Sequence, residues 1–327
     1  MTLEYVSCDY CGSDQATVVV RQTDKLHHTT DEYFTIVRCN VCGLHYTNPR
    51  PSPAEIARFY PSDYSFHGAT PRWRELLSRL LDWCANGQVA WLIGLVPAVG
   101  RRLAARVRPR IPDPVLEYYR RGGQGAYLDI GCGSGRHAHY WGHASSVGSC
   151  QRFTQVAGVE ASAAARELLA REGIDVWGDI DQVPLGRMFA VIRMNWSLEH
   201  VHSPSRYFRF IAERLLPGGR AVIAVPNYEG LIYRVAPDCV ELPIHLYHFR
   251  ACDIAAYADR FGLVVKAQHT FSYPEMFRAA GDAGLLPTAF ADYGDIFWAR
   301  AMMRSLKPFD DAGWGNDLLV VIERNGL

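Results

Sequence analysis

A short glycine-rich stretch constrains the fold of this chain more than any other part of its sequence. Residues Ala126–Gly135 read Ala-Tyr-Leu-Asp-Ile-Gly-Cys-Gly-Ser-Gly, so an apolar run ends in Asp129 and is followed by glycine at every second position. Glycine tolerates positive φ, and its missing Cβ lets the backbone approach a ligand closely. A second apolar run, Val156–Val159, ends in Glu160. This order of strand, glycine turn, helix, strand and acid predicts an α/β fold with a nucleoside-binding crevice.

The spacing of the glycines narrows the choice of nucleotide. A dinucleotide-binding turn reads G-x-G-x-x-G and seats a pyrophosphate on the N-terminus of the following helix. Here the third glycine, Gly135, comes one residue early, and Arg136 occupies the sixth position. The carboxylate of Glu160 can still accept hydrogen bonds from both hydroxyls of a ribose. A nucleoside without a phosphate is therefore favoured, and a nicotinamide-dependent dehydrogenase is the less favoured alternative.

The glycine turn resembles motif I of the class I S-adenosylmethionine (SAM)-dependent methyltransferases. Asn195–Val201, which reads Asn-Trp-Ser-Leu-Glu-His-Val, resembles a later motif of that family, and the resemblance covers residues 126–270 and resumes near 317. It implies a Rossmann-like, seven-stranded α/β domain that converts SAM to S-adenosylhomocysteine. The residues that the resemblance implies for SAM binding are Asp129, Gly131, Gly133, Gly135, Glu160, Asp179, Ile180 and Asn195.

Apolar periodicity predicts the elements of this domain. A helix is expected over Ser162–Glu172, with Ser162 as its N-cap. The segment Leu215–Gly219 is expected to close another helix before the fifth strand. The expected third, fourth and fifth strands are Ile174–Trp177, Phe189–Asn195 and Arg220–Val225.

Two features depart from the family pattern, and one residue allows a second interpretation. Between Gly135 and Glu160 lie 24 residues, more than the family usually needs, and the surplus around Ser145–Phe153 is expected to form a surface loop. Ala190 stands in the fourth strand where the family usually has Asp. Asp179 allows the second interpretation, because an Asp is also suited to a turn or to a helix N-cap.

Two pairs of cysteines near the N-terminus carry an independent signal. Cys8 and Cys11 form one C-x-x-C pair, Cys39 and Cys42 form another, and 27 residues separate the pairs. Four thiolates can surround Zn²⁺ tetrahedrally, which leaves no open position and indicates a structural site. A hairpin between the pairs absorbs the long separation. Disulfides and redox chemistry are the less favoured alternatives. The expected hairpin strands are Ala16–Gln22 and Tyr33–Val37.

Composition limits the cellular compartment and the binding partners that are expected for this protein. An odd number of cysteines, nine, without a secretory h-region favours a reducing, cytoplasmic compartment. The 34 basic and 34 acidic residues balance, so no nucleic-acid partner is expected. The longest apolar run, Val89–Val99, has about half the length of a membrane span. It contains Pro97, so we expect a buried helix and no membrane span.

The sequence divides into three expected parts. They are a zinc-binding ribbon module over residues 1–60, a helical bridge or lid over 61–125, and the SAM-binding methyltransferase domain over 126–327. The combination resembles zinc-containing small-molecule methyltransferases, including the deoxysugar C-methyltransferases. That resemblance implies a small-molecule acceptor, such as a secondary metabolite or a sugar or glycan precursor. It leaves homo-oligomer formation open. The alternative function is a catalytically inactive SAM-binding or zinc-ribbon interaction protein.

The acceptor side of the crevice is expected to supply the catalytic groups. Methyl transfer from a sulfonium depends mostly on alignment, and a base is needed where the acceptor must lose a proton. Pro243–Phe249 resembles the family segment after strand five, and His245 aligns with an active-site histidine of sugar C-methyltransferases. The family's preceding Glu is Ile244 here, which favours O-methylation or a different acceptor. The candidate catalytic residues are His245, His200, Tyr247 and Glu199.

Overall fold

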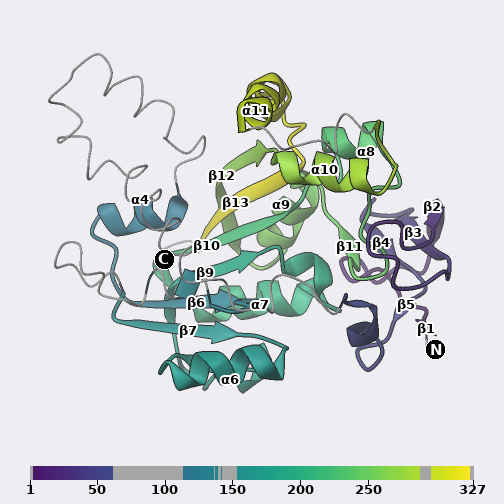
Figure 1. Ribbon diagram of the computed structural model, residues 1–327. Helices are drawn as coiled ribbons and strands as arrows, with labels where there is room; N and C mark the ends of the chain where they lie inside the picture. Colours follow the sequence, from purple (N-terminus) through teal and green to yellow (C-terminus); the bar gives the residue numbers. More distant parts are fainter. Residues whose placement is uncertain are drawn as a thin grey trace, which may run out of the picture.

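A seven-stranded sheet forms the centre of the protein (Figure 1). The computed structural model describes residues 3–61, 113–135, 137–138, 141, 153–287 and 296–324. The strand order is β12-β13-β10-β9-β6-β7-β8. The strands are β6 (Ala126–Ile130), β7 (Gln155–Val159), β8 (Asp175–Trp177), β9 (Phe189–Asn195), β10 (Leu215–Pro226), β12 (Leu263–Phe271) and β13 (Asp317–Arg324).

The pairing directions confirm the expected Rossmann-like α/β fold. Strands β8, β7, β6, β9 and β10 pair in parallel, whereas β13 is antiparallel to both β10 and β12. The chain adds strands on one side of β6 and then crosses to β9 on its other side. The carboxyl ends of β6 and β9 therefore flank a topological switch point, where open α/β sheets bind their ligands.

The helices fit the sequence expectations except at one end. Ser162 caps α6, since its Oγ accepts a hydrogen bond from the Ala165 N–H at 3.4 Å. The expectation that Leu215–Gly219 closes a helix is wrong, because α7 ends at Arg214 and buried Leu215 pairs with Phe189 of β9. The helices are α4 (Pro114–Arg120), α6 (Ala163–Arg171), α7 (Pro204–Arg214), α8 (Leu231–Val235), α9 (Ala251–Arg260), α10 (Pro274–Asp282) and α11 (Ile296–Asp311).

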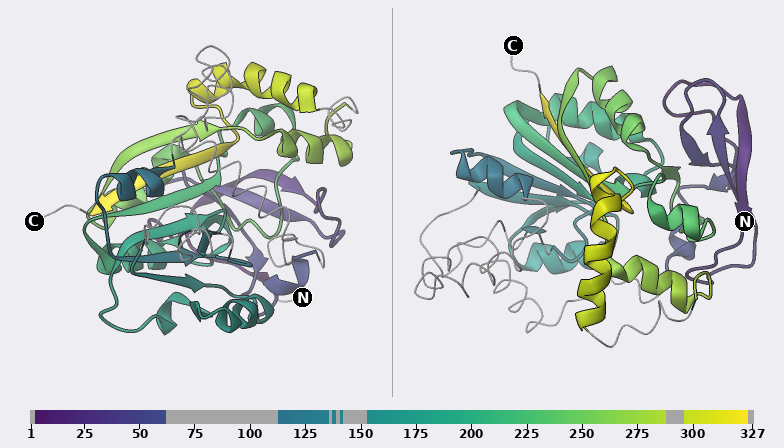
Figure 2. Two further views of the ribbon diagram at one scale, coloured as in Figure 1. Left: turned by 60° about the vertical axis from the view of Figure 1, so that its left-hand side comes forward. Right: turned by 90° about the horizontal axis from the view of Figure 1, so that it is seen from above.

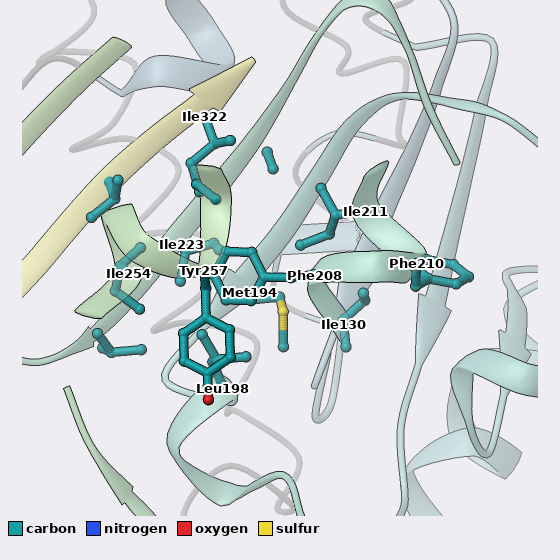
Figure 3. Close-up of a cluster of buried hydrophobic side chains, with 14 of the residues drawn as sticks. Ile130, Met194, Leu198, Phe208, Phe210, Ile211, Ile223, Ile254, Tyr257 and Ile322 are labelled. Carbon is teal, nitrogen blue, oxygen red and sulfur yellow. The ribbon is translucent and has the colours of Figure 1, made fainter. Parts of the chain in front are cut away.

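Alternate residues of β10 pack into different hydrophobic clusters on the two faces of the sheet. Ile223 joins Phe208 of α7 and Tyr257 of α9, whose rings stack with centroids 5.1 Å apart (Figure 3). Val222 points to the other face and joins Val115 of α4. Because successive side chains of a strand alternate and both faces are covered, the central strands read as nearly continuous apolar runs.

The expected surface loop before β7 needs a correction at its last residue. Phe153 is 5% exposed and packs against Tyr127 and Trp141, with ring centroids 5.4 and 5.5 Å away. An aromatic side chain of this size gains more from burial than from exposure. Residues 145–152 lie outside the described residues, as does the apolar run at 89–99. Within the described ranges, no helix has both the length and the apolar character that a membrane crossing requires.

The N-terminal strands lie to one side of the large sheet (Figures 1 and 2). A second sheet has the order β11-β4-β3-β2, and the short strands β1 and β5 pair separately. Its fourth strand, β11, comes from the segment that follows β10. The elements are β1 (Leu3–Glu4), β2 (Ala16–Gln22), β3 (Phe34–Cys39), β4 (His45–Thr47), β5 (Arg50–Pro51), the 3₁₀ helix η1 (Ile56–Phe59) and β11 (Tyr247–His248).

Polar contacts hold these N-terminal elements against helices α7 and α9 of the large domain. The carboxylate of Asp9 accepts hydrogen bonds from Tyr257 Oη at 2.8 Å, Ser205 N at 2.8 Å and Ser203 Oγ at 2.7 Å. The division at residues 60 and 125 stays a prediction. The bridge expected over 61–125 lies outside the described residues except for residue 61 and residues 113–125, which contain α4.

Candidate active site and cysteine cluster

The glycine turn after β6 is clamped between two neighbouring strands. Gly131, Gly133 and Gly135 have φ values of +75°, +51° and +82°, which favour glycine. The Gly131 N–H donates to the Val159 carbonyl at 2.8 Å. A Cβ atom at Gly131 would lie 2.4 Å from Cβ of Ser197, in the loop after β9. The turn therefore needs glycine for packing as well as for conformation.

Glu160 lies at the end of β7 with its carboxylate fixed by backbone donors. Its Oε2 accepts from the Gly133 N–H and its Oε1 accepts from the Ser162 N–H, both at 2.8 Å. The side chain is buried. An acid in this position can accept hydroxyl donors of a ribose.

Asp129 is buried beneath the turn. Its Oδ2 accepts no hydrogen bond from the described residues. Burial raises the pKa of this carboxyl to about 7; the Arg193 guanidinium opposes the rise and Glu160 adds to it. Cys132 inside the turn is also buried, which raises the pKa of its thiol well above the ordinary value. A thiol of this kind packs and does not act as a nucleophile.

The remaining residues expected at the cofactor lie along the same edge. Asp179 caps the 3₁₀ helix η2 (Ile180–Gln182) by accepting from the Asp181 N–H at 2.9 Å, and it forms an ion pair with Arg206. Burial raises the pKa of Asp179, but the hydrogen bonds from Arg206 and the Asp181 N–H together with the charge of Arg206 outweigh it, and the net pKa is lowered. Ile180 is buried in the main core, and Asn195 ends β9. Contact of these three side chains with SAM stays a prediction.

Three of the four candidate catalytic residues come together. His200 and Glu199 belong to the 3₁₀ helix η3 (Leu198–His200), and the His200 and His245 rings are 4.7 Å apart between centroids. Glu199 Oε1 is 3.9 Å from His200 Nε2. Glu199 is buried, which raises its pKa well above the ordinary value, and neither of its carboxylate oxygens has a hydrogen-bond partner within the described ranges.

Tyr247 lies apart from this group. Its hydroxyl accepts from Arg50 Nη1 at 3.2 Å and donates to the His202 carbonyl at 3.3 Å. Its ring stacks with Phe249 at 5.8 Å between centroids. Neighbouring residues of a strand point to opposite faces, so the side chains of Tyr247 and His248 lie on different sides of β11. His248 Nε2 lies 3.2 Å from Thr47 Oγ1.

Several residues beside the histidines were missed by the sequence reasoning. Tyr60 Oη lies 3.1 Å from His200 Nδ1, and Thr47 Oγ1 donates to the His245 carbonyl at 2.7 Å. Glu241 Oε2 lies 3.9 Å from His245 Nε2 and 2.9 Å from His27 Nε2. In the sequence, the one signal for this group is the spacing of four residues between Glu241 and His245. No local sequence pattern connects His27 to either residue.

The four N-terminal cysteines meet in one cluster. Their sulfur atoms all lie within 4.8 Å of one another, with Cys8–Cys42 and Cys11–Cys39 at 3.5 Å. These separations exceed a disulfide bond of about 2.05 Å. Gly12 and Gly43, each after a second cysteine, have φ values of +75° and +80°. The expected knuckle turns are therefore present, and the donor set fits a tetrahedral metal site.

Comparisons with known proteins show what this chain is similar to. A family described as a methyltransferase domain matches residues 67–268. None of the curated proteins matches the chain. A SAM-dependent methyltransferase structure from Mesorhizobium loti is 18% identical, with 64% of this chain and 96% of that chain covered and a TM-score of 0.43.

Two further solved structures are similar at the same level. A SAM-dependent methyltransferase from Clostridium acetobutylicum is 12% identical, with coverage of 62% of this chain and 85% of that chain and a TM-score of 0.39. A chain from the complex between the Trm112 methyltransferase activator and a methyltransferase of Haloferax volcanii is 16% identical. It covers 75% of this chain and 97% of its own length, with a TM-score of 0.43.

Proposed function

The chain belongs to the methyltransferase-domain family, and from this premise we propose that it transfers a methyl group from SAM to a small-molecule acceptor. The products are the methylated acceptor and S-adenosylhomocysteine. The observation that carries the proposal is the glycine turn at the switch point, which rests directly on the Glu160 carboxylate. The turn lets the backbone approach a bound ligand closely, and the Glu160 carboxylate can accept hydrogen bonds from ribose hydroxyls. The turn does not have the spacing of the third glycine that binding of a pyrophosphate requires.

We propose that the nucleoside lies along the carboxyl ends of β6, β7 and β8. Glu160 accepts from the ribose, the turn of Gly131, Gly133 and Gly135 admits the methionine portion, and Asp129 supports the turn from below. Asp179, Ile180 and Asn195 line the remaining edge. Ion pairing with Arg206 keeps the Asp179 carboxylate charged, so it can accept a hydrogen bond from the adenine amino group.

The acceptor is proposed to bind against His245, His200 and Glu199. Burial lowers the pKa of His245, so this imidazole is neutral near pH 7 and can take a proton from the acceptor. Tyr247 is the least supported of the four candidates, because its hydroxyl is engaged by Arg50 and the His202 carbonyl. The acceptor class that we propose is a secondary metabolite or a sugar precursor.

The cysteine cluster is proposed to hold one structural Zn²⁺. Four sulfur ligands at about 2.3 Å would complete a tetrahedral site with no position for a substrate. The cluster follows β1 and joins the start of β2 to the end of β3. The metal would thus stabilise the N-terminal sheet. This sheet carries Thr47 in β4, and Tyr60 follows β4 in the chain.

Native mass spectrometry of the purified protein tests both parts of this proposal. One zinc ion and co-purified S-adenosylhomocysteine are expected, followed by release of S-adenosylhomocysteine when a panel of sugar and secondary-metabolite acceptors is supplied with SAM. Calorimetric titration with SAM and with NAD separates the methyltransferase from a dehydrogenase. SAM binding without turnover on any acceptor would favour the inactive SAM-binding alternative.

A further inference from the structure

One partly buried carboxylate lies between two imidazoles at the acceptor side. Glu241 belongs to the segment between α8 and β11, and its Oε2 is 2.9 Å from His27 Nε2 and 3.9 Å from His245 Nε2. His27 comes from the turn between β2 and β3, more than 200 residues earlier in the chain. The three side chains therefore bring together the N-terminal elements and the segment that carries the proposed base.

The backbone around Glu241 is fixed on the N-terminal sheet. The His245 N–H donates to the Glu241 carbonyl at 2.8 Å, which closes one turn and places both side chains on the same side. The side-chain amide of Gln22, in β2, donates to the carbonyls of Asp238 at 3.0 Å and Val240 at 3.2 Å. Leu242 is buried in a cluster with aromatic and aliphatic side chains of the N-terminal elements, including Phe34, Ile36 and Phe59.

The groups around Glu241 favour its ionised form. Burial alone would raise the pKa of Glu241, but the charges of the protonated His245, His27 and His200 rings and the hydrogen bond from His27 lower it to about 2. Burial lowers the pKa of His245, Glu241 opposes this, and His27 lowers it further. The groups that face His245 are Glu241, His27, His200, His248 and Glu199.

We propose that Glu241 is a positioning residue for His245 and that His27 holds Glu241 in place. The inference rests on the proposed methyl transfer. A carboxylate beside Nε2 favours the tautomer with the proton on that nitrogen, which leaves Nδ1 of His245 as the proton acceptor. Their separation of 3.9 Å is longer than a hydrogen bond, and such contacts often tighten when the substrate complex forms.

The proton and electron balance follows directly. The acceptor's X–H bond breaks as its proton passes to Nδ1 of His245. The electron pair left on X forms the bond to the methyl carbon while the S–CH₃ bond breaks, and S-adenosylhomocysteine leaves. Glu241 stays ionised throughout and stabilises the imidazolium, which later releases its proton to water.

Histidine titration by NMR tests the inference without knowledge of the acceptor. The side-chain signal of His245 is identified by its loss in His245→Ala and followed against pH in the full-length protein. Glu241→Gln keeps the shape and removes the charge, so the pKa of His245 should fall by about 0.5 or more. Glu229→Gln is the matched control, because Glu229 is an exposed carboxylate in the loop after β10. It should leave the titration unchanged.

Variants of His27 test how Glu241 is held. Both His27→Ala and His27→Gln remove the charge by which His27 lowers the pKa of His245, but only His27→Gln can still donate a hydrogen bond to Glu241. The pKa of His245 should therefore be lower in His27→Ala than in His27→Gln, because a mobile Glu241 spends less time near the ring. The control is His28→Asn: His28 is exposed and has φ of +52°, which asparagine tolerates. With an acceptor in hand, Glu241→Gln should lower kcat about tenfold or more while KM for SAM stays unchanged.

Three results would overturn the inference. An unchanged His245 titration in Glu241→Gln is the first. The second is an equal pKa of His245 in His27→Gln and His27→Ala, which would remove the role of His27. The third is selective broadening of the His200 and His245 signals by stoichiometric Mn²⁺. Glu199, His200 and His245 each place one ligand atom within 4.8 Å of the others, so that result would assign a cation site instead. Calorimetry with SAM reports on the proposed function separately, since the histidine titration needs no cofactor.

Discussion

The backbone N–H of Gly133 donates to Glu160 Oε2 at 2.8 Å, so the glycine turn and the acid at the end of β7 form one unit. Substitution of the acid tests that unit. Glu160→Ala should weaken SAM binding strongly, because hydrogen bonds to a charged group contribute about 1.5–3 kcal/mol each. Calorimetry should show a loss of roughly tenfold to a hundredfold. Glu167→Ala, an exposed change on α6, is the control. Equal affinities would mean that the ribose does not lie on β7.

The packing of Gly131 gives a second prediction. Gly131→Ala places a Cβ 2.4 Å from that of Ser197 and also strains a residue at φ of +75°, so SAM binding and the melting temperature should both fall. Gly173→Ala is matched in conformation, with φ of +77° and no atom within 4 Å of the new Cβ. It should show only the backbone cost of about 1–3 kcal/mol.

A double variant checks the cause of the Gly131 effect. Ser197→Gly removes the Cβ that clashes, so Gly131→Ala combined with Ser197→Gly should regain part of the lost stability. If the double variant is no more stable than Gly131→Ala, the steric explanation is incorrect.

The cysteine cluster gives a third prediction. Cys39→Ser should lower the zinc content measured by elemental analysis and lower the unfolding temperature of the N-terminal elements, because metal binding and folding are coupled. SAM affinity should stay roughly intact, since the glycine turn lies on the large sheet. Cys252→Ser is the control, because Cys252 is an exposed cysteine on α9 away from the cluster. Normal stability in metal-free wild-type protein would contradict the proposal.

Proton transfer gives the fourth prediction. Burial lowers the pKa of His245, and a base works only when neutral, so turnover should fall as pH drops through this lowered value and stay level above it. His245→Ala should lower turnover about tenfold or more and flatten the acidic limb, while SAM still binds. Exposed His269 provides the control variant, His269→Ala. An unchanged profile in His245→Ala would place the base elsewhere, with His200 the next to test.

Local patterns predicted the parts of the fold that local physics decides. The strand Phe189–Asn195 matches its expected bounds, because seven mostly apolar residues between turns can only be buried on both faces. Ser162 caps α6 as expected, since its hydroxyl reaches a free backbone donor. The spacing of the C-x-x-C pairs likewise indicated a cluster that the fold assembles.

Contacts between residues far apart in the sequence account for the site residues that the sequence did not predict. His27 and Glu241 are 214 residues apart, and no periodicity links a turn in one sheet to a turn beside another. The pairing of β11 with β4 involves only two residues on β11, too few for a strand signal. Ser205 and Tyr257 donate to Asp9 across a similar sequence distance. Such contacts arise from tertiary packing and need the structure to be seen.

The pairing of β4 with β11 has a consequence for the order of folding. During synthesis the cysteine cluster and strands β2 to β4 leave the ribosome well before residues 247 and 248, which follow about 200 residues later. Until then β4 is an open sheet edge, a surface that invites pairing with other chains. A fragment that ends before β11 should therefore aggregate even with zinc bound, because its sheet stays incomplete until β11 has been made.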